Sequence, residues 1–280
     1  MSKEYFQTSK ILNNTKIDGG LRKNNIFKKS KKNEPLLTIV TAVFNNEKFL
    51  EESILSLHNQ KYANYEHIVI DGGSTDGTID IIKKYEDKID YWCSEKDKGI
   101  YDAFNKGMKL ASGEYIGFLN SDDKYSDNAF EILIRYIKEN TDKDFIFGAV
   151  KKHWGILYGY KPYKIYWSWG FYSSHSTGFF IKTESAKKVG LYNLKYKFSA
   201  DYDLFYRMIV KLKMKGMATK KNEIMGHFRT DGLSSRIKYI DYLNENTLIR
   251  LDNGQNKFIV KIIHFFRYIK RIKIILKQKK

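Results

Sequence analysis

The sequence predicts an α/β fold built on a mainly parallel sheet that helices cover on both faces. Apolar, β-branched runs alternate along the chain with segments whose apolar residues recur at helical spacing. Polar or glycine-containing turns follow these runs. Because parallel neighbours must be joined by crossover segments, this alternation of strands and helices indicates a parallel sheet.

The elements follow in order from residue 36. Residues 37–43 form an apolar, β-branched run that predicts a buried strand, and residues 49–58 carry apolar side chains at helical spacing. The same two patterns predict strands at 67–70, 89–93, 115–119 and 145–150, and helices at 78–85, 100–110 and 200–212. Ligands of open parallel sheets bind beyond the carboxyl ends of the strands. We therefore expect one edge of the sheet to gather the polar segments that follow the strands, at 44–45, 71, 95–99 and 120–123.

The composition indicates a globular protein with an anionic partner. The 280 residues suffice for one large domain with appendages or for two small domains, and 42% of them are hydrophobic. The net charge of +18 suits nucleic acid, an acidic membrane surface or phosphorylated substrates. Cys93 is the only cysteine, so the chain forms no internal disulfide, and a buried structural thiol in a reducing cytoplasm is expected.

Two segments stand outside the regular alternation. Residues 1–34 are polar and rich in Lys and Asn, which predicts a mobile N-terminal arm and no signal peptide. Residues 151–180 are rich in aromatic residues and lack a regular period, so they form either a sugar-stacking acceptor surface or the core of an added layer, which we favour. No stretch reaches the roughly 20 uncharged apolar residues that cross a bilayer, so we do not expect an integral membrane protein.

Paired acids follow the predicted strand at 115–119, in the segment Asn120, Ser121, Asp122 and Asp123. Two carboxylates at the end of a buried strand are unfavourable unless a cation lies there. Hard cations such as Mg²⁺ and Mn²⁺ often bridge protein carboxylates to substrate phosphates, so this segment points to diphosphate chemistry. The alternative is an N-cap cluster for the following helix.

The turn at residues 71–78, DGGSTDGT, is the second polar segment of interest. Its glycines permit positive φ and close backbone approach, so its amides and the next helix N-terminus are able to face an anion or a nucleotide. Asp71 is placed to accept from a base or a ribose. An ordinary capped turn explains the same residues equally well, and no P-loop ending is present.

Four motifs in order resemble those of glycosyltransferase family 2. They are TIVTAVFNNE at 38–47, IDGGSTDGT at 70–78, EKDKGIYDAFNKG at 95–107 and GEYIGFLNSDD at 113–123. The likeness extends from about residue 36 to about residue 235 and is nearest to bacterial enzymes that build O-antigen, capsule or glycan side chains. The resemblance implies the GT-A fold, a Rossmann-like domain that binds a nucleoside diphosphate sugar, usually a UDP sugar, with Mg²⁺ or Mn²⁺.

The resemblance also assigns residues of this sequence to the donor. Asp71 is expected at the uracil or ribose, and Gly99 and Asn105 are expected to border the donor site. The residues expected along the nucleotide are Thr41, Phe44, Asn45 and Glu47.

The segment from Asn120 to Asp122 takes the place of the family's Asp-x-Asp motif, with Asn at the first position. An amide oxygen is a weaker, neutral ligand, so Asp122 is expected to be the main metal ligand. Asp123 is expected to help, and Asn120 and Ser121 to contact the donor.

The resemblance also implies transfer with inversion, which requires a base near the acceptor hydroxyl. The segment ADYDL at 200–204 resembles the family's Glu-Asp-Tyr-Asp-Leu, which makes Asp201 the candidate base; favourable carboxylates at a helix start are the alternative. Three further residues are candidates for acceptor or diphosphate contacts, namely His175, Asp203 and Arg229. A structural histidine and solvated loop charges explain His175 and Arg229 as well.

The C-terminal residues 256–280 mix apolar and basic side chains and contain no acid. Five cationic positions share one helical face, Lys257, Lys261, His264, Arg267 and Arg271, which suits an interfacial helix on anionic lipid. A helix packed on the catalytic domain or on a partner chain is the alternative.

The predicted organisation is an arm at 1–34, a GT-A domain at 35–240 and a basic helical region at 241–280. Within the GT-A domain, residues 35–125 form the nucleotide-sugar half and 126–240 the acceptor half. The predicted function is inverting transfer from a UDP-hexose or UDP-N-acetylhexosamine to a saccharide, lipid-linked, at the inner face of a bacterial membrane. The alternatives are a nucleic-acid-binding protein and an inactive scaffold, the latter because Asn120 and Ala200 depart from the family pattern.

Overall fold

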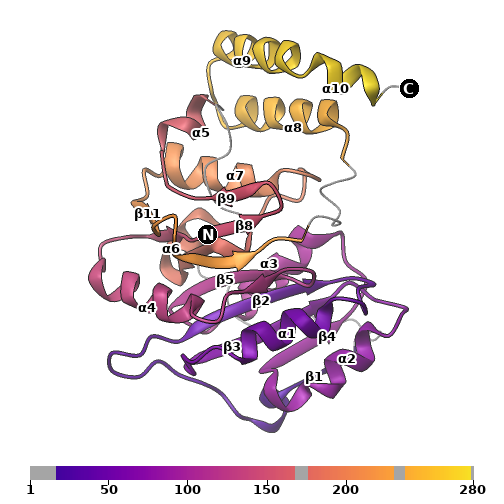
Figure 1. Cartoon of the computed structure of the whole chain (residues 1–280), viewed down its shortest axis with the longest axis vertical. Helices are drawn as coiled ribbons and strands as arrows, with labels where there is room; N and C mark the ends of the chain where they lie inside the picture. The colour runs from indigo at the N-terminus through magenta and orange to yellow at the C-terminus, as the bar shows by residue number, and fades with distance from the viewer. Residues whose placement is uncertain (1–16, 168–175, 230–236, 279–280) are drawn as a thin grey trace.

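The computed structural model describes residues 17–167, 176–229 and 237–278. Within them, an eight-stranded sheet has the order β1-β4-β3-β2-β5-β10-β7-β11, and a four-stranded sheet has the order β6-β12-β8-β9 (Figure 1). The larger sheet is mixed but mostly parallel and is flanked by helices, which confirms the predicted fold class.

Four parallel neighbours form the centre of the larger sheet, in the order β4, β3, β2 and β5. Their bounds are Leu37–Val43 (β2), Tyr65–Asp71 (β3), Tyr91–Ser94 (β4) and Tyr115–Asn120 (β5). The crossover helices are Leu50–His58 (α1), Thr78–Lys84 (α2) and Ile100–Leu110 (α3). The predicted alternation is confirmed here, and each predicted boundary lies within two residues of the observed one.

The predicted strand at 145–150 is instead two strands that belong to different sheets. Phe145–Phe147 (β7) pairs with β10, Phe179–Lys182, in the larger sheet, whereas Ala149–Lys152 (β8) pairs with β12, Ile224–His227, in the smaller one. The chain changes sheets at Gly148, where a Cβ would lie 2.6 Å from the sulfur of Met225. This division brings the smaller sheet against the edge where the polar segments collect.

The remaining elements complete the second half of the chain. The strands are Lys124–Tyr125 (β6), Gly155–Leu157 (β9) and Gly216–Ala218 (β11). The helices are Ala129–Glu139 (α4), Tyr163–Trp167 (α5), Thr183–Val189 (α6) and Ala200–Tyr206 (α7). The predicted helix at 200–212 thus ends early as an α-helix and continues as a π-helical turn, Arg207–Lys211.

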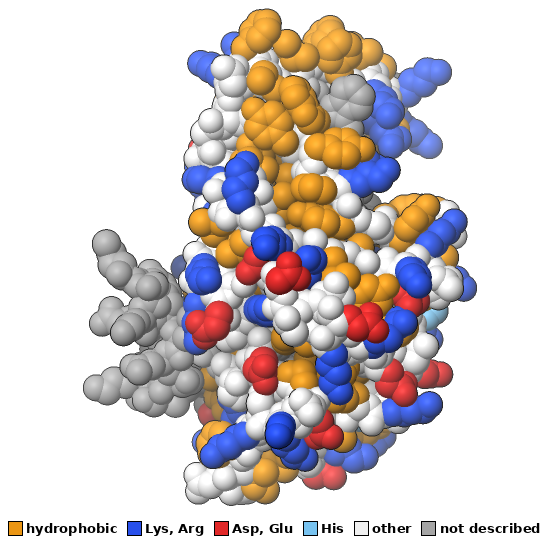
Figure 2. Space-filling model, turned by 90° about the vertical axis from the view of Figure 1, so that its left-hand side faces the viewer, with side chains coloured by type: hydrophobic (Ala, Val, Ile, Leu, Met, Phe, Trp, Pro, Cys, Tyr) orange, Lys and Arg blue, Asp and Glu red, His pale blue; other side chains and the backbone are white. Residues whose placement is uncertain are grey.

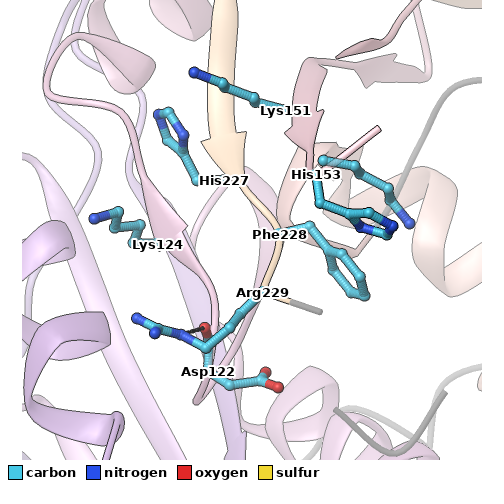
Figure 3. Close-up of a pocket in the computed structure, with 8 residues that line it drawn as sticks. Asp122, Lys124, Lys151, His153, His227, Phe228 and Arg229 are labelled. Carbon is cyan, nitrogen blue, oxygen red and sulfur yellow. Dashed lines mark hydrogen bonds between the residues drawn. The ribbon is translucent and has the colours of Figure 1, made fainter. Parts of the chain in front are cut away.

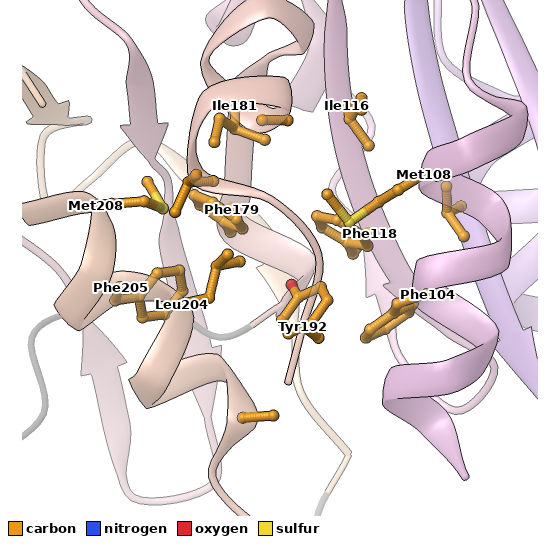
Figure 4. Packing of buried hydrophobic residues seen from close by; sticks show 14 of the residues in the cluster. Phe104, Met108, Ile116, Phe118, Phe179, Ile181, Tyr192, Leu204, Phe205 and Met208 are labelled. Atoms are coloured by element: carbon orange, nitrogen blue, oxygen red, sulfur yellow. The ribbon is translucent and has the colours of Figure 1, made fainter. Parts of the chain in front are cut away.

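One hydrophobic core joins the two halves of the chain (Figure 4). The ring of Phe118 on β5 stacks on that of Phe179 on β10, with centroids 5.9 Å apart. Phe179 in turn meets Phe205 on α7 edge to face, with centroids 4.8 Å apart. Since α7 carries the candidate base, this aromatic contact fixes it relative to the nucleotide half.

The prediction of a mobile N-terminal arm is wrong for residues 17–24, which form regular structure. Ile17–Gly19 (β1) pairs with β4 at the sheet edge, and a 3₁₀ turn, Leu21–Asn24, follows. The guanidinium of Arg22 forms an ion pair with Glu66, whose carboxylate is buried. Residues 1–16 lie outside the described part.

The aromatic residues described after Lys151 divide between core and surface: Phe179 and Phe180 are fully buried, as the core expectation predicts, whereas that expectation is wrong for the exposed rings. Tyr160 packs edge to face on Phe145, with centroids 5.5 Å apart. By contrast, four other rings are exposed, those of Trp154, Tyr158, Tyr163 and Trp167.

The C-terminal region divides into an inner helix and two outer helices. Tyr239–Asp252 (α8) belongs to the main body, because the buried guanidinium of Arg250 donates to the backbone oxygens of Ile165 and Tyr166. Lys257–Lys270 (α9) and Ile272–Lys277 (α10) lie over α8 (Figure 1). Within the three described ranges, none of the helices combines the length and the hydrophobicity needed to span a bilayer.

Candidate active site

Two loops at the carboxyl ends of β2 and β3 are joined by reciprocal hydrogen bonds. The amide of Asn45 donates to the hydroxyl of Ser74 at 2.7 Å, and the amide of Thr75 donates to the Asn45 side-chain oxygen at 2.8 Å. Further along, the amide of Gly77 donates to the Glu47 carboxylate at 2.7 Å. Asn45 has a positive φ of 46°, which Asn tolerates better than most residues. The motif residues therefore build a single continuous rim, beside which the ring of Phe44 is exposed.

Asp71 fixes the conformation of this rim through hydrogen bonds. Its buried carboxylate accepts from the amides of Gly73 and Ser74, both at 2.9 Å, and from the hydroxyls of Ser74 and Ser94. These four bonds match the acceptor capacity of a carboxylate. The structure thus gives Asp71 a loop-positioning role, and its expected contact with a base or ribose stays a proposal.

Asn46 joins the β2 loop to the acidic segment and was not singled out from the sequence. Its side-chain amide donates to the hydroxyl of Ser121 at 2.8 Å. Asn46 lies inside the first family motif, at 38–47, and that motif is the sequence signal that could have identified it.

Asp123 is buried behind Asp122 and holds the acidic segment in shape. Its carboxylate accepts from the Asn120 amide at 2.9 Å, the Thr177 hydroxyl at 2.8 Å and the Arg229 backbone N–H at 3.1 Å. Burial, reinforced by the neighbouring charge of Asp122, raises the pKa of the Asp123 carboxyl to about 7. The segment does not cap a helix, because β6 follows it and α4 begins only at Ala129.

Asp122 is the acid of this segment that faces open space. It lines a pocket of about 320 Å³, and no ion pair involving its carboxylate occurs among the residues that the structure describes. Burial raises the pKa of its carboxyl. The remaining lining residues are Lys124, Lys151, Lys152, His153, His227, Phe228 and Arg229 (Figure 3).

The oxygen ligands that the protein offers here fit a hard cation that takes most of its ligands from a substrate. Asp122 offers a carboxylate, and the side-chain oxygen of Asn120 is buried without a hydrogen-bond partner. No group of three or more His, Cys, Asp or Glu suited to a metal occurs in the described ranges. Magnesium-type ions are commonly held by one or two carboxylates together with substrate phosphates, so two oxygens are compatible with such an ion.

Asp201 lies at the start of α7 with one carboxylate oxygen occupied. That oxygen accepts from the Tyr202 amide at 2.8 Å and from the Tyr101 hydroxyl at 3.3 Å. Burial raises the pKa of the Asp201 carboxyl to about 6. A carboxylate with this pKa is ionised at neutral pH and accepts protons more readily than an ordinary one.

Asp203, two residues later, is engaged inside the protein. Its buried carboxylate pairs with the Arg207 guanidinium at 2.9 Å and accepts from the Asn253 amide at 2.8 Å. The structure therefore places it between α7 and α8 instead of in contact with an acceptor.

Two predicted donor residues are likewise used internally. The hydroxyl of Thr41 is buried and 2.9 Å from the imidazole of His67. The Asn105 side chain exchanges two hydrogen bonds, both 2.8 Å, with the backbone of Tyr192. Both residues support the site from within, so we leave them out of the proposed donor contacts.

Gly99 opens α3 with a positive φ of 106°, and a Cβ there would meet nothing within 4 Å. The positive φ explains why position 99 is a glycine, whereas close packing does not. His175 lies outside the described residues.

Arg229 connects the acidic segment to α1. Its Nε donates to the backbone oxygen of Asp122 at 3.2 Å, and its guanidinium pairs with Glu52 and lies over the ring of Phe49. The arginine is therefore anchored beside Asp122. It is the last residue of the described range 176–229.

Comparison with known proteins identifies the family. Residues 38–202 match the family model described as "Glycosyl transferase family 2". An uncharacterized glycosyltransferase of Rickettsia typhi is 27% identical over 270 residues, which cover 86% of this chain and 84% of that protein. TuaG of Bacillus subtilis, whose name assigns it to teichuronic acid biosynthesis, is 32% identical over 111 residues, or 39% of this chain and 44% of TuaG.

Solved structures with the same fold include TarS and a mannosyltransferase. S. aureus TarS 1–349 in complex with UDP-GlcNAc superposes with a TM-score of 0.61 at 18% identity, covering 81% of this chain and 70% of that one. The mannosyltransferase PcManGT of Pyrobaculum calidifontis, in complex with GDP-Man and Mn²⁺, gives a TM-score of 0.60 at 16% identity, with coverages of 83% and 68%. The family match covers more than half of the chain and includes the loops after β2 and β3 together with Asp122, Asp123 and Asp201. The chain therefore belongs to glycosyl transferase family 2 and is a glycosyltransferase of the GT-A fold.

Proposed function

We propose that this chain transfers a hexose or N-acetylhexosamine from its UDP sugar to a saccharide hydroxyl with inversion. The carrying observation is that Asp122 lines a pocket and that its segment is joined to the loop of Asn45 by the hydrogen bond from the Asn46 side-chain amide to the Ser121 hydroxyl. TarS binds UDP-GlcNAc and PcManGT binds GDP-Man with Mn²⁺, which supports a diphosphate donor at this edge.

In the proposed reaction Asp201 acts as the base. It takes the proton of the acceptor hydroxyl through its second carboxylate oxygen while the hydroxyl oxygen attacks the anomeric carbon. The bond from that carbon to the diphosphate breaks, and the nucleoside diphosphate leaves with its bonding electrons. Tyr101 and the Tyr202 amide keep the carboxylate oriented through the first oxygen.

The leaving diphosphate needs positive charge around it. A bound Mn²⁺ or Mg²⁺ would supply that charge. Asp122 and the side-chain oxygen of Asn120 are the residues that would hold the ion, and Asp123 would orient them.

The acceptor proposed for this enzyme is a lipid-linked saccharide of bacterial surface polysaccharide synthesis, reached from the inner face of the membrane. The name of TuaG supports the pathway class. The outer helices α9 and α10 support the location, because hydrophobic side chains gather over the C-terminal part of the molecule with Lys and Arg beside them (Figure 2).

The outward side of α9 is more apolar than its sequence pattern suggested. His264 bonds to the Thr247 hydroxyl at 2.9 Å and Arg267 lies over the Tyr242 ring, so both half-buried side chains contact α8. Exposed apolar residues take the outer positions, namely Phe258, Ile262, Phe265, Phe266 and Ile269. Exposed lysines lie between these apolar residues, and the segment contains no acid. Such a surface suits insertion into an anionic lipid interface.

A thermal-shift screen of UDP, GDP and dTDP sugars, with and without Mn²⁺, tests the donor assignment. We expect a UDP sugar to raise the melting temperature most, and only in the presence of Mn²⁺. Equal shifts for all three nucleotides, or a shift that ignores the metal, would contradict the proposed donor and cofactor.

A further inference from the structure

The pocket beside Asp122 carries an excess of positive charge. Its lining contains four Lys or Arg side chains and two His against the single carboxylate of Asp122. Two of the four cations, Lys124 and Arg229, share Glu52 as their ion-pair partner. For Lys151 and Lys152, no carboxylate lies within ion-pair distance among the residues the structure describes.

The two lysines lie on opposite faces of the smaller sheet. Lys151 is in register with His227 on the neighbouring parallel strand, so these two share a face. The next residues, Lys152 and Phe228, take the opposite face, and the Lys152 Nζ lies 3.9 Å from the centre of the Phe228 ring. Figure 3 shows the Phe228 ring and the Asp122 carboxylate on one side, away from His227 and Lys124.

The ammonium of Lys152 is therefore held on the catalytic side of the sheet. The side chain is half-buried, and the aromatic face beneath it favours a cation. Burial lowers the pKa of Lys152, while the charges of Asp123 and Asp201 oppose that shift. Both the acidic segment and the proposed base thus act on this one cation.

The position of Lys152 favours the acceptor over the donor. The nucleotide rim is built from loops after β2 and β3 of the larger sheet. Lys152 is on β8 of the smaller sheet and lines the pocket of Asp122, and the described lining of that pocket includes no residue of the rim. An anion that it bound would belong to the molecule whose hydroxyl Asp201 deprotonates.

We propose that Lys152, with the Phe228 ring beneath it, forms a subsite for a phosphate or carboxylate group of the acceptor, so that the enzyme selects an anionic saccharide. The inference rests on the proposed function for the identity of the acceptor side. A charge-assisted hydrogen bond from the ammonium to the anion would orient the acceptor hydroxyl toward Asp201.

The test is a calorimetric titration of the full chain with sn-glycerol 3-phosphate, with and without saturating UDP and Mn²⁺, using glycerol as the neutral control. We expect glycerol phosphate to bind in both conditions and glycerol not to bind. Lys152→Gln should weaken that binding about tenfold, the effect of one lost charge-assisted hydrogen bond. Lys152→Arg should restore most of it, and Lys151→Gln, one residue away on the other face, should change it less than about threefold by loss of a more distant charge.

The outcomes separate this inference from the proposed function. If UDP displaces glycerol phosphate, or if Lys152→Gln weakens UDP binding as much, the cation belongs to the donor diphosphate and the acceptor subsite is refuted. Equal losses for the Lys151 and Lys152 variants would show a diffuse positive field and also refute the subsite. If wild-type chain binds glycerol phosphate but no nucleotide, the proposed donor fails while the anion site stands.

Discussion

Replacing Asp201 with Asn isolates the proposed base with little change in shape. Both described hydrogen bonds to the carboxylate, from Tyr101 and from the Tyr202 amide, end on the same oxygen. An Asn amide oxygen can keep both bonds, so the variant loses the basic oxygen and not the local packing. Loss of a positioned general base lowers turnover by roughly 10²- to 10⁴-fold, or about 3–5 kcal/mol of transition-state stabilisation.

The pH dependence supplies a second measure of the same group. The Asp201 carboxyl has a pKa of about 6 because of burial. Below that pH the protonated form cannot accept a proton, so kcat/KM should fall about tenfold per pH unit and level off above pH 7. The assay is release of UDP from a UDP sugar, measured by a coupled enzyme from pH 5 to pH 8.

Asp203→Asn is the matched control on the same helix. Its carboxylate is buried and paired with Arg207, so the variant should lose about 2–4 kcal/mol of unfolding free energy but keep turnover per folded molecule. Turnover by Asp201→Asn above about a tenth of wild type, or a flat pH profile, would refute the base assignment.

Three further predictions concern the metal, the rim and the membrane. Asp122→Ala should lower UDP affinity in Mn²⁺ at least about tenfold while leaving metal-free affinity unchanged, as measured by calorimetry; unchanged affinity in Mn²⁺ would contradict the ligand role. Ser74→Ala removes the hydroxyl that joins the two loops, so UDP binding should weaken about tenfold with loss of one to two hydrogen bonds, and equal binding would contradict a role for the rim. Changing Phe265 and Phe266, 59% and 66% exposed, to Ser should reduce sedimentation with anionic lipid vesicles at least about tenfold without changing solution turnover; undiminished sedimentation would contradict insertion of α9.

The central fold was predictable because its signals are local. The strand at 37–43 and the helix at 100–110 have the predicted bounds, since these depend on nearby β-branched residues, a glycine cap and apolar spacing. The pairing of β1 with β4 joins residues more than 70 positions apart and leaves little trace in the polar segment around Ile17. The break at Gly148 depends on Met225 from another strand, and no pattern within 145–150 reports it.

The site was predictable in its motifs but not in how each residue is used. The resemblance to family motifs located Asp122 and Asp201 in the sequence. In the structure Asp122 faces a pocket, and both hydrogen bonds that Asp201 accepts from described residues end on one of its carboxylate oxygens. The sequence did not show that the side chains of Asn105 and Asp203 would bond to other parts of the protein. Lys152 carried no signal, because its importance depends on the register of β8 with β12.

The most direct test of the central claim is to follow a UDP sugar by proton NMR with the purified chain, with and without Mn²⁺. The account predicts metal-dependent release of UDP and, with water as the acceptor, a free sugar whose first-formed anomer has the configuration opposite to that in the donor. A sugar formed with retained configuration, or no turnover of any UDP, GDP or dTDP sugar, would contradict it.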